Sequence, residues 1–401
     1  MYKKTYLWLI ITLVVTFLFL SPNLKSDFLN WDDPVYITTN KLIKDTSLSG
    51  VKKIFSTREV VGTYSPLVLL SWSVDYKVSQ LNPFTFHLFN ILFHLVVVAL
   101  VYYLALLLSK RMEVAFIASL LFGIHPMHVE AVGWISARKD LIYSLFFFGA
   151  LIIYHFYLDS NKKRSSRFLY LTCLFLFCLS LLSKGTAIMF PFILLLIDYL
   201  KNRKNLKNIL IEKIPFFILS LLFVYIAIIG QTSEGAIDNA INMTSVNSIS
   251  VGLYGYIIYL VKIIIPFNLS GYHPYPDMIG EQLPWYFYIS ATPIIALFIL
   301  TIAKARTRRF FGFGIMFFFI TLVPVLQVLP FGTAVIAERY TYLPYFGLFL
   351  LFAIWIVRAI DTYRKFEKPI WILLSSCIIM LGIRSFQYSK TYNNSEVFCR
   401  C

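Results

Sequence analysis

The chain has few charged residues and few cysteines for its length. Only 14% of its 401 residues are Asp, Glu, Lys or Arg, whereas 59% are hydrophobic, and the mean hydropathy is +0.73. Soluble domains are usually about 25% charged, so the composition excludes a large soluble protein and indicates an integral membrane protein. The five cysteines form neither a disulfide framework nor a zinc-binding pattern. The chain also lacks a P-loop, a dinucleotide-binding fingerprint and a Gly-x-Ser-x-Gly motif.

Apolar runs long enough to cross a bilayer as helices recur along the whole chain. The first run follows a basic start and has no small-residue cleavage site before Pro22, so we interpret it as a retained signal anchor. We predict a single all-α polytopic membrane domain over residues 1–401, with about 11 transmembrane helices. The expected spans lie near 6–21, 86–109, 112–125, 141–158, 168–183, 186–200, 214–230, 285–303, 310–329, 341–359 and 369–386.

Lysine and arginine are missing from residues 231–249 and 267–284, which flank the apolar segment 250–266. Most of the basic residues fall in other short loops, and the positive-inside rule places those loops in the cytoplasm. The N-terminus is then cytoplasmic, the C-terminus lies outside, and residues 231–284 form an outer loop. We expect 250–266 to be a re-entrant or interfacial helix with Lys262 snorkelling towards water. Anchoring beside anionic lipid accounts for the net charge of +16 without a nucleic-acid partner.

Acidic residues are scarce within the expected spans, and most of the 20 fall in the outer loops. Ion-coupled transporters usually carry ionisable residues at membrane depth, where the coupling ion binds. Their scarcity here favours an enzyme that works at the outer surface. A lipid-linked glycan flippase or transporter, and a non-catalytic membrane scaffold of the same fold, are the alternatives.

The first outer loop, residues 22–85, carries two adjacent carboxylates in the stretch "NWDDPVY". Asp32 and Asp33 could form a turn or cap a helix, since Asp and Pro favour both. Two carboxylates this close repel each other, so one keeps a raised pKa or the pair shares a cation. Such a pair suits a general base or a metal ligand. We also expect two short amphipathic helices in this loop, in "SLSGVKKIFST" and "YSPLVLLSWSVDYKV".

The second outer loop, residues 125–140, gathers the densest set of polar side chains in the chain. The sequence "HPMHVEAVGWISARKD" contains His125, His128, Glu130, Arg138, Lys139 and Asp140. Its spacing is not that of a His-Glu-x-x-His zinc protease. Arginine suits a phosphate through its planar fork of donors, and the alternative is a purely structural interfacial cluster.

Three further residues add charge to the expected outer surface. "SKGTA" puts Lys184 at the end of a tight helical hairpin, and "AERYTYLP" puts Glu338 and Arg339 at the mouth of a span. Helix capping or interface anchoring is the alternative for each. Within the second span, we interpret His87 and His94 as polar contacts between helices.

These motifs resemble one family. "FLNWDDPVYIT", "NPFTFHLFNILFH", "GIHPMHVEAVGWISARKDL", "SLLSKGTAIMFPFILLLIDYL", "PFNLSGYHPYP" and "AERYTYLPYFG" occur in a single order. Together they resemble the membrane portion of the transmembrane and tetratricopeptide-repeat O-mannosyltransferases and their bacterial relatives. These belong to the GT-C glycosyltransferase superfamily. The resemblance covers roughly residues 20–398.

The resemblance implies a GT-C bundle that moves a sugar, with mannose as a candidate, from a polyprenyl-phosphate donor to a hydroxyl on the non-cytoplasmic side. The acceptor would be a protein Ser or Thr, or a surface glycan or lipid. The catalytic acids fall on Asp32 and Asp33, and the donor phosphate would be bound by Arg138, Arg339 and Lys184. The residues that would orient the substrate or a metal are His125, His128, Glu130, Asp140 and Glu338. A divalent metal is left open, with Asp33, His125, His128 and Glu130 as candidate ligands.

The sequence departs from the family in two places. Relatives often have an arginine after the tyrosine of a Tyr-x-Pro-Leu motif, where this chain has Ser65. No 34-residue tetratricopeptide repeat is present, which makes glycosyl transfer more secure than protein O-mannosylation. The membrane would be the plasma membrane in a bacterium, or the endoplasmic reticulum in a eukaryote.

Overall fold

The computed structural model describes residues 2–57, 63–233, 244–276, 282–326 and 334–399. Nearly all of this chain is helical, as expected when every backbone N–H and C=O must be satisfied without water. Parts of the expected outer loops, at 58–62, 234–243 and 277–281, lie outside the described residues.

Eight apolar segments in the described part of the chain are long enough to cross a membrane. They centre on α1 (Tyr2–Leu20), α5 (Pro83–Ser109), α8 (Arg138–Asp159), α9 (Lys163–Leu181), α11 (Leu206–Ser233), α14 (Ala291–Ala305), α16 (Tyr345–Thr362) and α17 (Glu367–Ser389). The protein is therefore an integral membrane protein with an all-α bundle, as the composition predicted.

Three expected spans are shorter or broken. Helix α6 (Met112–Ile124) is followed, after a bend of 56°, by the short turn η3 (Pro126–His128) and α7 (Val129–Gly133). Helices α10 (Phe190–Leu200) and α15 (Arg309–Leu322) have 11 and 14 residues. At 1.5 Å per residue, such helices are shorter than the roughly 30 Å hydrocarbon core. The number of spans and their orientation stay predictions.

The remaining helices and strands lie between or beyond these segments. The α-helices are α2 (Lys41–Lys44), α3 (Leu48–Ser56), α4 (Pro66–Ser79), α12 (Ser245–Lys262), α13 (Trp285–Ile289) and α18 (Ser395–Cys399). One short π-helix, η2 (Pro34–Thr38), follows the acid pair. The remaining short 3-10 helices are η1 (Ser21–Lys25), η4 (Ile135–Ala137), η5 (Gly185–Met189), η6 (Val323–Val325), η7 (Glu338–Thr341), η8 (Arg364–Phe366) and η9 (Lys390–Tyr392). Strands β1 (His273–Pro274) and β2 (Ala334–Ile336) pair antiparallel.

Both short helices expected in the first outer loop are present, as α3 and α4. Their inner faces form a small separate core with the start of α5 and α8, around Ile54, Trp72, Phe86 and Ile142. Helix α12, the expected re-entrant segment, is not among the spanning candidates.

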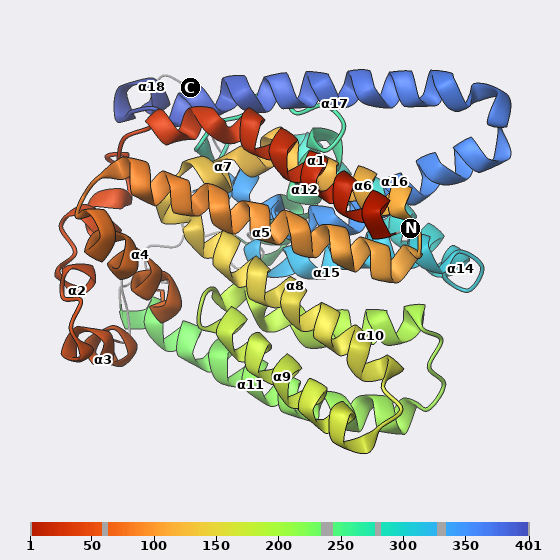
Figure 1. Ribbon diagram of the computed structural model, residues 1–401, viewed down its shortest axis with the longest axis horizontal. Helices are drawn as coiled ribbons and strands as arrows, with labels where there is room; N and C mark the ends of the chain where they lie inside the picture. Colours follow the sequence, from red (N-terminus) through yellow and green to blue (C-terminus); the bar gives the residue numbers. More distant parts are fainter. Residues whose placement is uncertain (1, 58–62, 234–243, 277–281, 327–333, 400–401) are drawn as a thin grey trace.

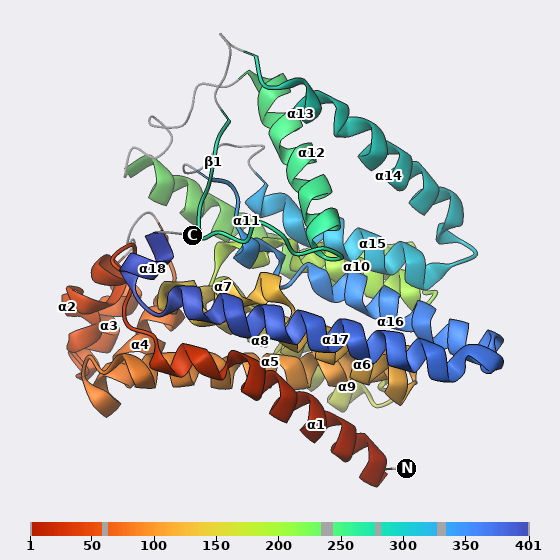
Figure 2. The ribbon, with the colours of Figure 1, turned by 90° about the horizontal axis from the view of Figure 1, so that it is seen from above.

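The elements of the first loop gather at one end of the bundle. Figure 1 shows α2, α3, α4 and α18 together at this end, whereas the N-terminus lies at the opposite end. Figure 2 shows α12, α13 and α14 reaching away from the other helices. We call the end that carries α2–α4 and α18 the acidic-loop end, because Asp32 and Asp33 lie there.

Helices α15 and α16 approach each other most closely at a pair of glycines. A Cβ atom built on Gly314 would lie 2.6 Å from the carbonyl oxygen of Gly347. No side chain fits in that space, so these two helices are locked backbone to backbone beneath the acidic-loop end.

Candidate active site

Asp33 joins the two predicted outer loops. Its carboxylate is fully buried and accepts hydrogen bonds from the backbone N–H groups of Leu29 (2.8 Å) and Ser136 (3.1 Å), and from the Ser136 hydroxyl. Burial raises the pKa of Asp33 to about 6, although these hydrogen bonds oppose the shift. Asp33 therefore anchors the turn of the first loop against the segment that precedes α8.

Asp32 is in a different situation one residue earlier. Its side chain is half-buried, and its carboxylate has no hydrogen-bond or ion-pair partner in the described part of the chain. Its neighbour Trp31 lies between two aromatic rings, Tyr272 at 5.8 Å and Phe398 at 5.9 Å between centroids. Of the two acids, Asp32 is thus the one that is free to meet a substrate.

Arg138 is fully buried and is held by protein groups. Its guanidinium pairs with Asp75 at 2.5 Å and donates to Asn90 Oδ1 (2.6 Å), the Phe86 carbonyl (2.8 Å) and Ser71 Oγ (3.3 Å). This geometry corrects the expectation of an open phosphate-binding arginine, because most of its donors are already engaged. Arg138 instead ties α4, α5 and α8 together.

Glu130 and Arg339 meet across the bundle, although 209 residues separate them. Buried Glu130 accepts hydrogen bonds from the Arg339 backbone N–H (2.8 Å) and from its guanidinium. The guanidinium also lies over the rings of Trp134 (4.9 Å) and Tyr340 (5.1 Å). The side chain of Arg339 keeps 18% of its surface exposed, so part of this cation remains accessible.

Lys184 and Asp140, both predicted site residues, form an ion pair with each other. The Nζ atom lies 2.5 Å from Asp140 Oδ1 and over the rings of Tyr143 (5.6 Å) and Tyr340 (5.7 Å). Burial lowers the pKa of Lys184, whereas the Asp140 charge opposes that shift. This pair fixes the α9–α10 turn to the start of α8.

Glu338 holds Lys262, and this pair overturns the expectation that Lys262 snorkels. The Lys262 ammonium is buried, 2.8 Å from Glu338 and 3.0 Å from the Asn268 carbonyl, so it turns inward to a carboxylate rather than outward to water. His273 also lies 2.8 Å from Glu338. Burial alone would raise the pKa of Glu338, but the His273 hydrogen bond and the Lys262 charge hold it below its usual value.

The two histidines of the second loop are packed among aromatic rings. His125 Nε2 lies 3.1 Å from the Ile263 carbonyl, and His128 Nδ1 lies 2.8 Å from the Phe122 carbonyl. Within the described ranges, no three His, Cys, Asp or Glu side chains come close enough to share a metal ion. The four candidate metal ligands are thus not brought together, because each is bound by a different protein group.

The polar residues of the second span do connect helices, as interpreted. His94 lies 2.7 Å from the Tyr342 hydroxyl and 2.9 Å from the Gly123 carbonyl, and His87 lies 3.4 Å from the Asp27 carbonyl. These contacts join the second span to the first outer loop and to the segments around Gly123 and Tyr342.

Comparison with known proteins gives this arrangement a context. A protein O-mannosyl-transferase of Caenorhabditis elegans is 27% identical over 391 residues, which cover 93% of this chain and 53% of that protein. The chain resembles the protein O-mannosyl-transferases. A human protein O-mannosyl-transferase is 41% identical over 93 residues, 23% of this chain and 10% of its own length. The chain spans about half the length of the Caenorhabditis relative. No protein-family profile matches it.

Solved structures agree on the fold. The apo oligosaccharyltransferase of Archaeoglobus fulgidus matches with a TM-score of 0.52 and 12% identity, over 96% of this chain and 56% of that chain. The same enzyme in complex with an inhibitory peptide and a dolichol-phosphate matches with a TM-score of 0.51 and 13% identity, over 99% and 56%. The O-mannosyltransferase resemblance and the polytopic fold class predicted from the sequence are confirmed.

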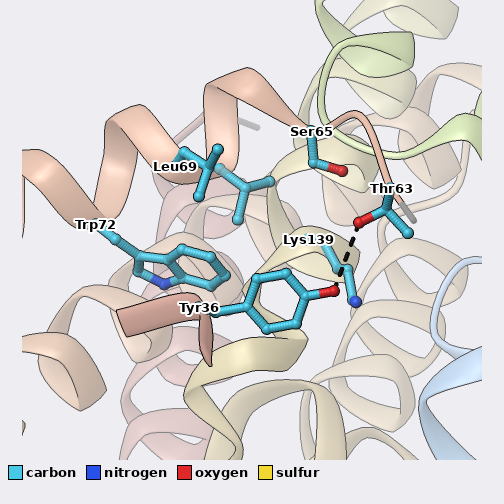
Figure 3. A pocket seen from close by; sticks show the side chains of 7 residues that line it. Tyr36, Thr63, Ser65, Leu69, Trp72 and Lys139 are labelled. Carbon is cyan, nitrogen blue, oxygen red and sulfur yellow. Dashed lines mark hydrogen bonds between the residues drawn. The ribbon is translucent and has the colours of Figure 1, made fainter. Parts of the chain in front are cut away.

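One residue of this O-mannosyl-transferase-like site did not stand out in the sequence, and another was noted without being assigned to the site. Asp75, the partner of Arg138, lies inside an amphipathic helix, where an acid looks like ordinary surface. Lys139 belongs to the polar cluster of the second outer loop but was not among the predicted site residues. Lys139 lines a recess together with Tyr36, Thr63, Ser65, Val68, Leu69 and Trp72 (Figure 3).

Proposed function

We propose that the chain is a glycosyltransferase that moves a sugar, with mannose as the candidate, from a polyprenyl-phosphate donor to a hydroxyl of a protein acceptor. The reaction takes place on the non-cytoplasmic face. The observation that carries this proposal is Asp32, a carboxylate that has no partner among the described residues and lies beside an acid that is firmly held. The similarity to the O-mannosyl-transferases supports the reaction class.

Asp32 acts as the general base. It takes the proton from the acceptor hydroxyl, whose oxygen attacks the anomeric carbon of the donor sugar. The bond from that carbon to the phosphate oxygen breaks in the same step, and the electron pair leaves with the polyprenyl phosphate. A single displacement of this kind inverts the anomeric centre. Base catalysis by one positioned group typically contributes about 10²–10⁴-fold.

The cations at the acidic-loop end stabilise the leaving phosphate. The side chains of Arg339 and Lys184 are 18% and 13% exposed. Each can therefore direct an N–H group towards the phosphate while it stays paired with its carboxylate. Arg138, Glu130, Asp140 and Glu338 serve by positioning, since each holds an oppositely charged neighbour in place.

His125 and His128 take part only indirectly in this mechanism. Their contacts to carbonyl groups and rings shape the wall of the second loop and orient the donor through Glu130 and Arg339. No step of this mechanism uses a divalent ion, because no three acid, histidine or cysteine side chains of the described residues lie close enough together to hold one.

Purified protein in proteoliposomes tests the proposal, with polyprenyl-phosphate mannose and a Ser/Thr-containing peptide as substrates. We expect mannosyl peptide from the unaltered chain and a loss of about 10²–10⁴-fold in Asp32→Asn. Asp27→Asn, an exposed acid of the same loop, is the matched control and should transfer normally. Asp33→Asn should lose activity together with thermal stability, because its three hydrogen bonds hold the turn.

Normal transfer by Asp32→Asn would remove Asp32 as the base. Movement of the intact lipid-linked sugar across the bilayer, without transfer to peptide, would favour the flippase instead. Transfer to a glycan or lipid but not to peptide would keep the enzyme and change the acceptor.

A further inference from the structure

Most cations that form buried contacts at the acidic-loop end are neutralised one to one by carboxylates. Four such pairs are present, each with N–O distances of 2.8 Å or less: Arg138 with Asp75, Lys184 with Asp140, Lys262 with Glu338, and Arg339 with Glu130. Burying a charge is costly unless a partner compensates it. A cation left uncompensated in this region therefore needs an explanation.

Lys139 is that cation. It is half-buried, and in the described residues its ammonium has neither a carboxylate nor a hydrogen-bond partner. Its contact is with the ring of Tyr36, whose centroid lies 5.0 Å from Nζ. Such a cation–ring contact is worth about 0.5–1 kcal/mol at exposed sites, far less than an ion pair in a buried setting. The position is thus poised for an anion that the protein itself does not supply.

The surroundings of Lys139 offer hydroxyl groups rather than acids. Figure 3 shows the Tyr36 hydroxyl and Thr63 near its ammonium, with the two hydroxyl oxygens 3.5 Å apart, and Ser65 farther away on the same recess. The floor is apolar, with Trp72 and Leu69 closing the recess. Hydroxyl groups and one ammonium form a donor set that suits phosphate oxygens, and the described residues that line the recess include no carboxylate.

The recess lies beside the acid pair because residues 33–36 and residues 136–139 contact each other at two points. Asp33 contacts Ser136, and three residues further along each segment Tyr36 contacts Lys139. The Tyr36 backbone N–H also donates to the Asp32 carbonyl at 3.0 Å. The recess and the acid pair are therefore built on the same two segments of the chain.

We propose that Lys139 and the hydroxyls of this recess bind the phosphate of the lipid-linked donor and of the polyprenyl phosphate that leaves. This assignment rests on the proposed function and names the group that recognises its donor. Lys139 performs the direct phosphate contact that the buried, engaged Arg138 next to it does not. Ser65, the residue before α4, lines the same recess from the side opposite α8.

Donor kinetics in proteoliposomes test the assignment. Lys139→Ala should raise the KM for polyprenyl-phosphate mannose about ten- to hundredfold, the range expected for a lost charge-assisted hydrogen bond. Lys139→Arg should restore most of the loss. Ser65→Arg in the Lys139→Ala background should also restore it, because the new guanidinium enters the recess from the opposite wall. Lys52→Ala, an exposed lysine of α3, is the control and should behave as the unaltered chain.

A binding measurement separates this inference from the proposed function. Radiolabelled polyprenyl phosphate is bound to the protein in nanodiscs, without sugar or acceptor. We expect Lys139→Ala to weaken this binding by the same factor as the KM. We also expect neither inorganic phosphate nor phosphatidylglycerol to displace the label at equal concentration.

Two results would overturn the inference while leaving the transferase intact. One is a Lys139→Ala variant with unchanged polyprenyl-phosphate affinity and unchanged KM for the donor. The other is equal displacement by inorganic phosphate or phosphatidylglycerol, which would make the recess a general phosphate or headgroup site. Lys139-dependent binding without any sugar transfer by the unaltered chain would instead reject the proposed function alone.

Discussion

The two ends of the bundle bury comparable ion pairs, but they balance their charges differently. At the end opposite the acidic loop, Lys213 is fully buried, 2.6 Å from Asp198, and its ammonium also reaches the Tyr154 hydroxyl. Arg203 bridges Asp198 (3.0 Å) and Glu212 (2.7 Å). Within this network each cation has an acid and each acid has a cation.

The acidic-loop end repeats this pattern four times and then departs from it. In the part of the chain that the structure describes, Asp32 has no cation and Lys139 has no carboxylate, although their neighbours Asp33, Arg138 and Asp140 are all held by protein groups. A network whose charges all match stabilises helices and needs no ligand. A network with one acid and one cation left over can accept a proton and an anion. The difference separates a structural clamp from a candidate site at the two ends of one fold.

The largest expected effect comes from breaking the balanced end. Lys213→Met leaves Asp198 without its closest cation in a buried setting and should lower the free energy of unfolding by about 3–5 kcal/mol. The matched change at the other end, Lys139→Met, breaks no ion pair and should alter stability by only about 0.5 kcal/mol. Denaturation of both purified variants in detergent measures this. Equal losses would show that the two ends do not differ in this way.

A smaller effect is expected from pH. Burial raises the pKa of Asp33 and of Asp75 to about 6 each, and protonation of Asp33 would remove the hydrogen bond from Leu29 that holds the turn. Transfer should therefore fall about tenfold per pH unit below pH 6. The phosphodiester donor keeps its charge over this range, so the enzyme is the titrating partner.

The free energy of unfolding should rise, while the transfer rate falls, as the pH is lowered over the same range. A carboxyl group whose pKa is higher in the folded state binds protons more tightly there, so folding is favoured as the pH falls from about 6 towards 3.8. Activity and unfolding measured in the same buffers distinguish the two effects. Activity that stays flat down to pH 4.5, or that falls only together with unfolding, would contradict this assignment.

The smallest effect is expected at an exposed pair. Arg111 lies 2.9 Å from Asp361 and 3.2 Å from Glu113, and all three side chains are 39–47% exposed. Arg111→Ala should cost about 1 kcal/mol or less, and high salt should reduce that cost further. A loss as large as that of Lys213→Met would mean that exposure does not distinguish these networks.

The acid pair and the second loop were predictable because charge stands out in an apolar chain. Asp32, Asp33, Glu130 and Arg339 each drew attention through residue type alone. Their pairing did not follow from the sequence, since nothing local indicates that Glu130 meets a residue 209 positions away. Tertiary contact also separated the roles of Asp32 and Asp33, which the sequence left equivalent.

The errors have a common physical cause. Arg138 and Lys262 were expected to face phosphate or water because long cations usually do. Arg138 instead pairs with buried Asp75, which looked like ordinary surface in its helix, and Lys262 pairs with Glu338, which was expected in the site but not as its partner. Lys139 was noted in the second loop but not assigned to the site, since the sequence does not show which cation of a charged run stays unpaired.

The contact between the first loop and the segment after α17 has a consequence for biosynthesis. The Asp27 backbone N–H donates to the Asn393 carbonyl at 2.8 Å, and the Asn30 N–H donates to Ser395 Oγ at 2.7 Å. A chain emerging from the ribosome inserts its first helix early, yet the turn that carries Asp32 waits for these partners. The nascent protein should stay inactive until residue 395 has been delivered, so partly inserted chains would not modify acceptors prematurely.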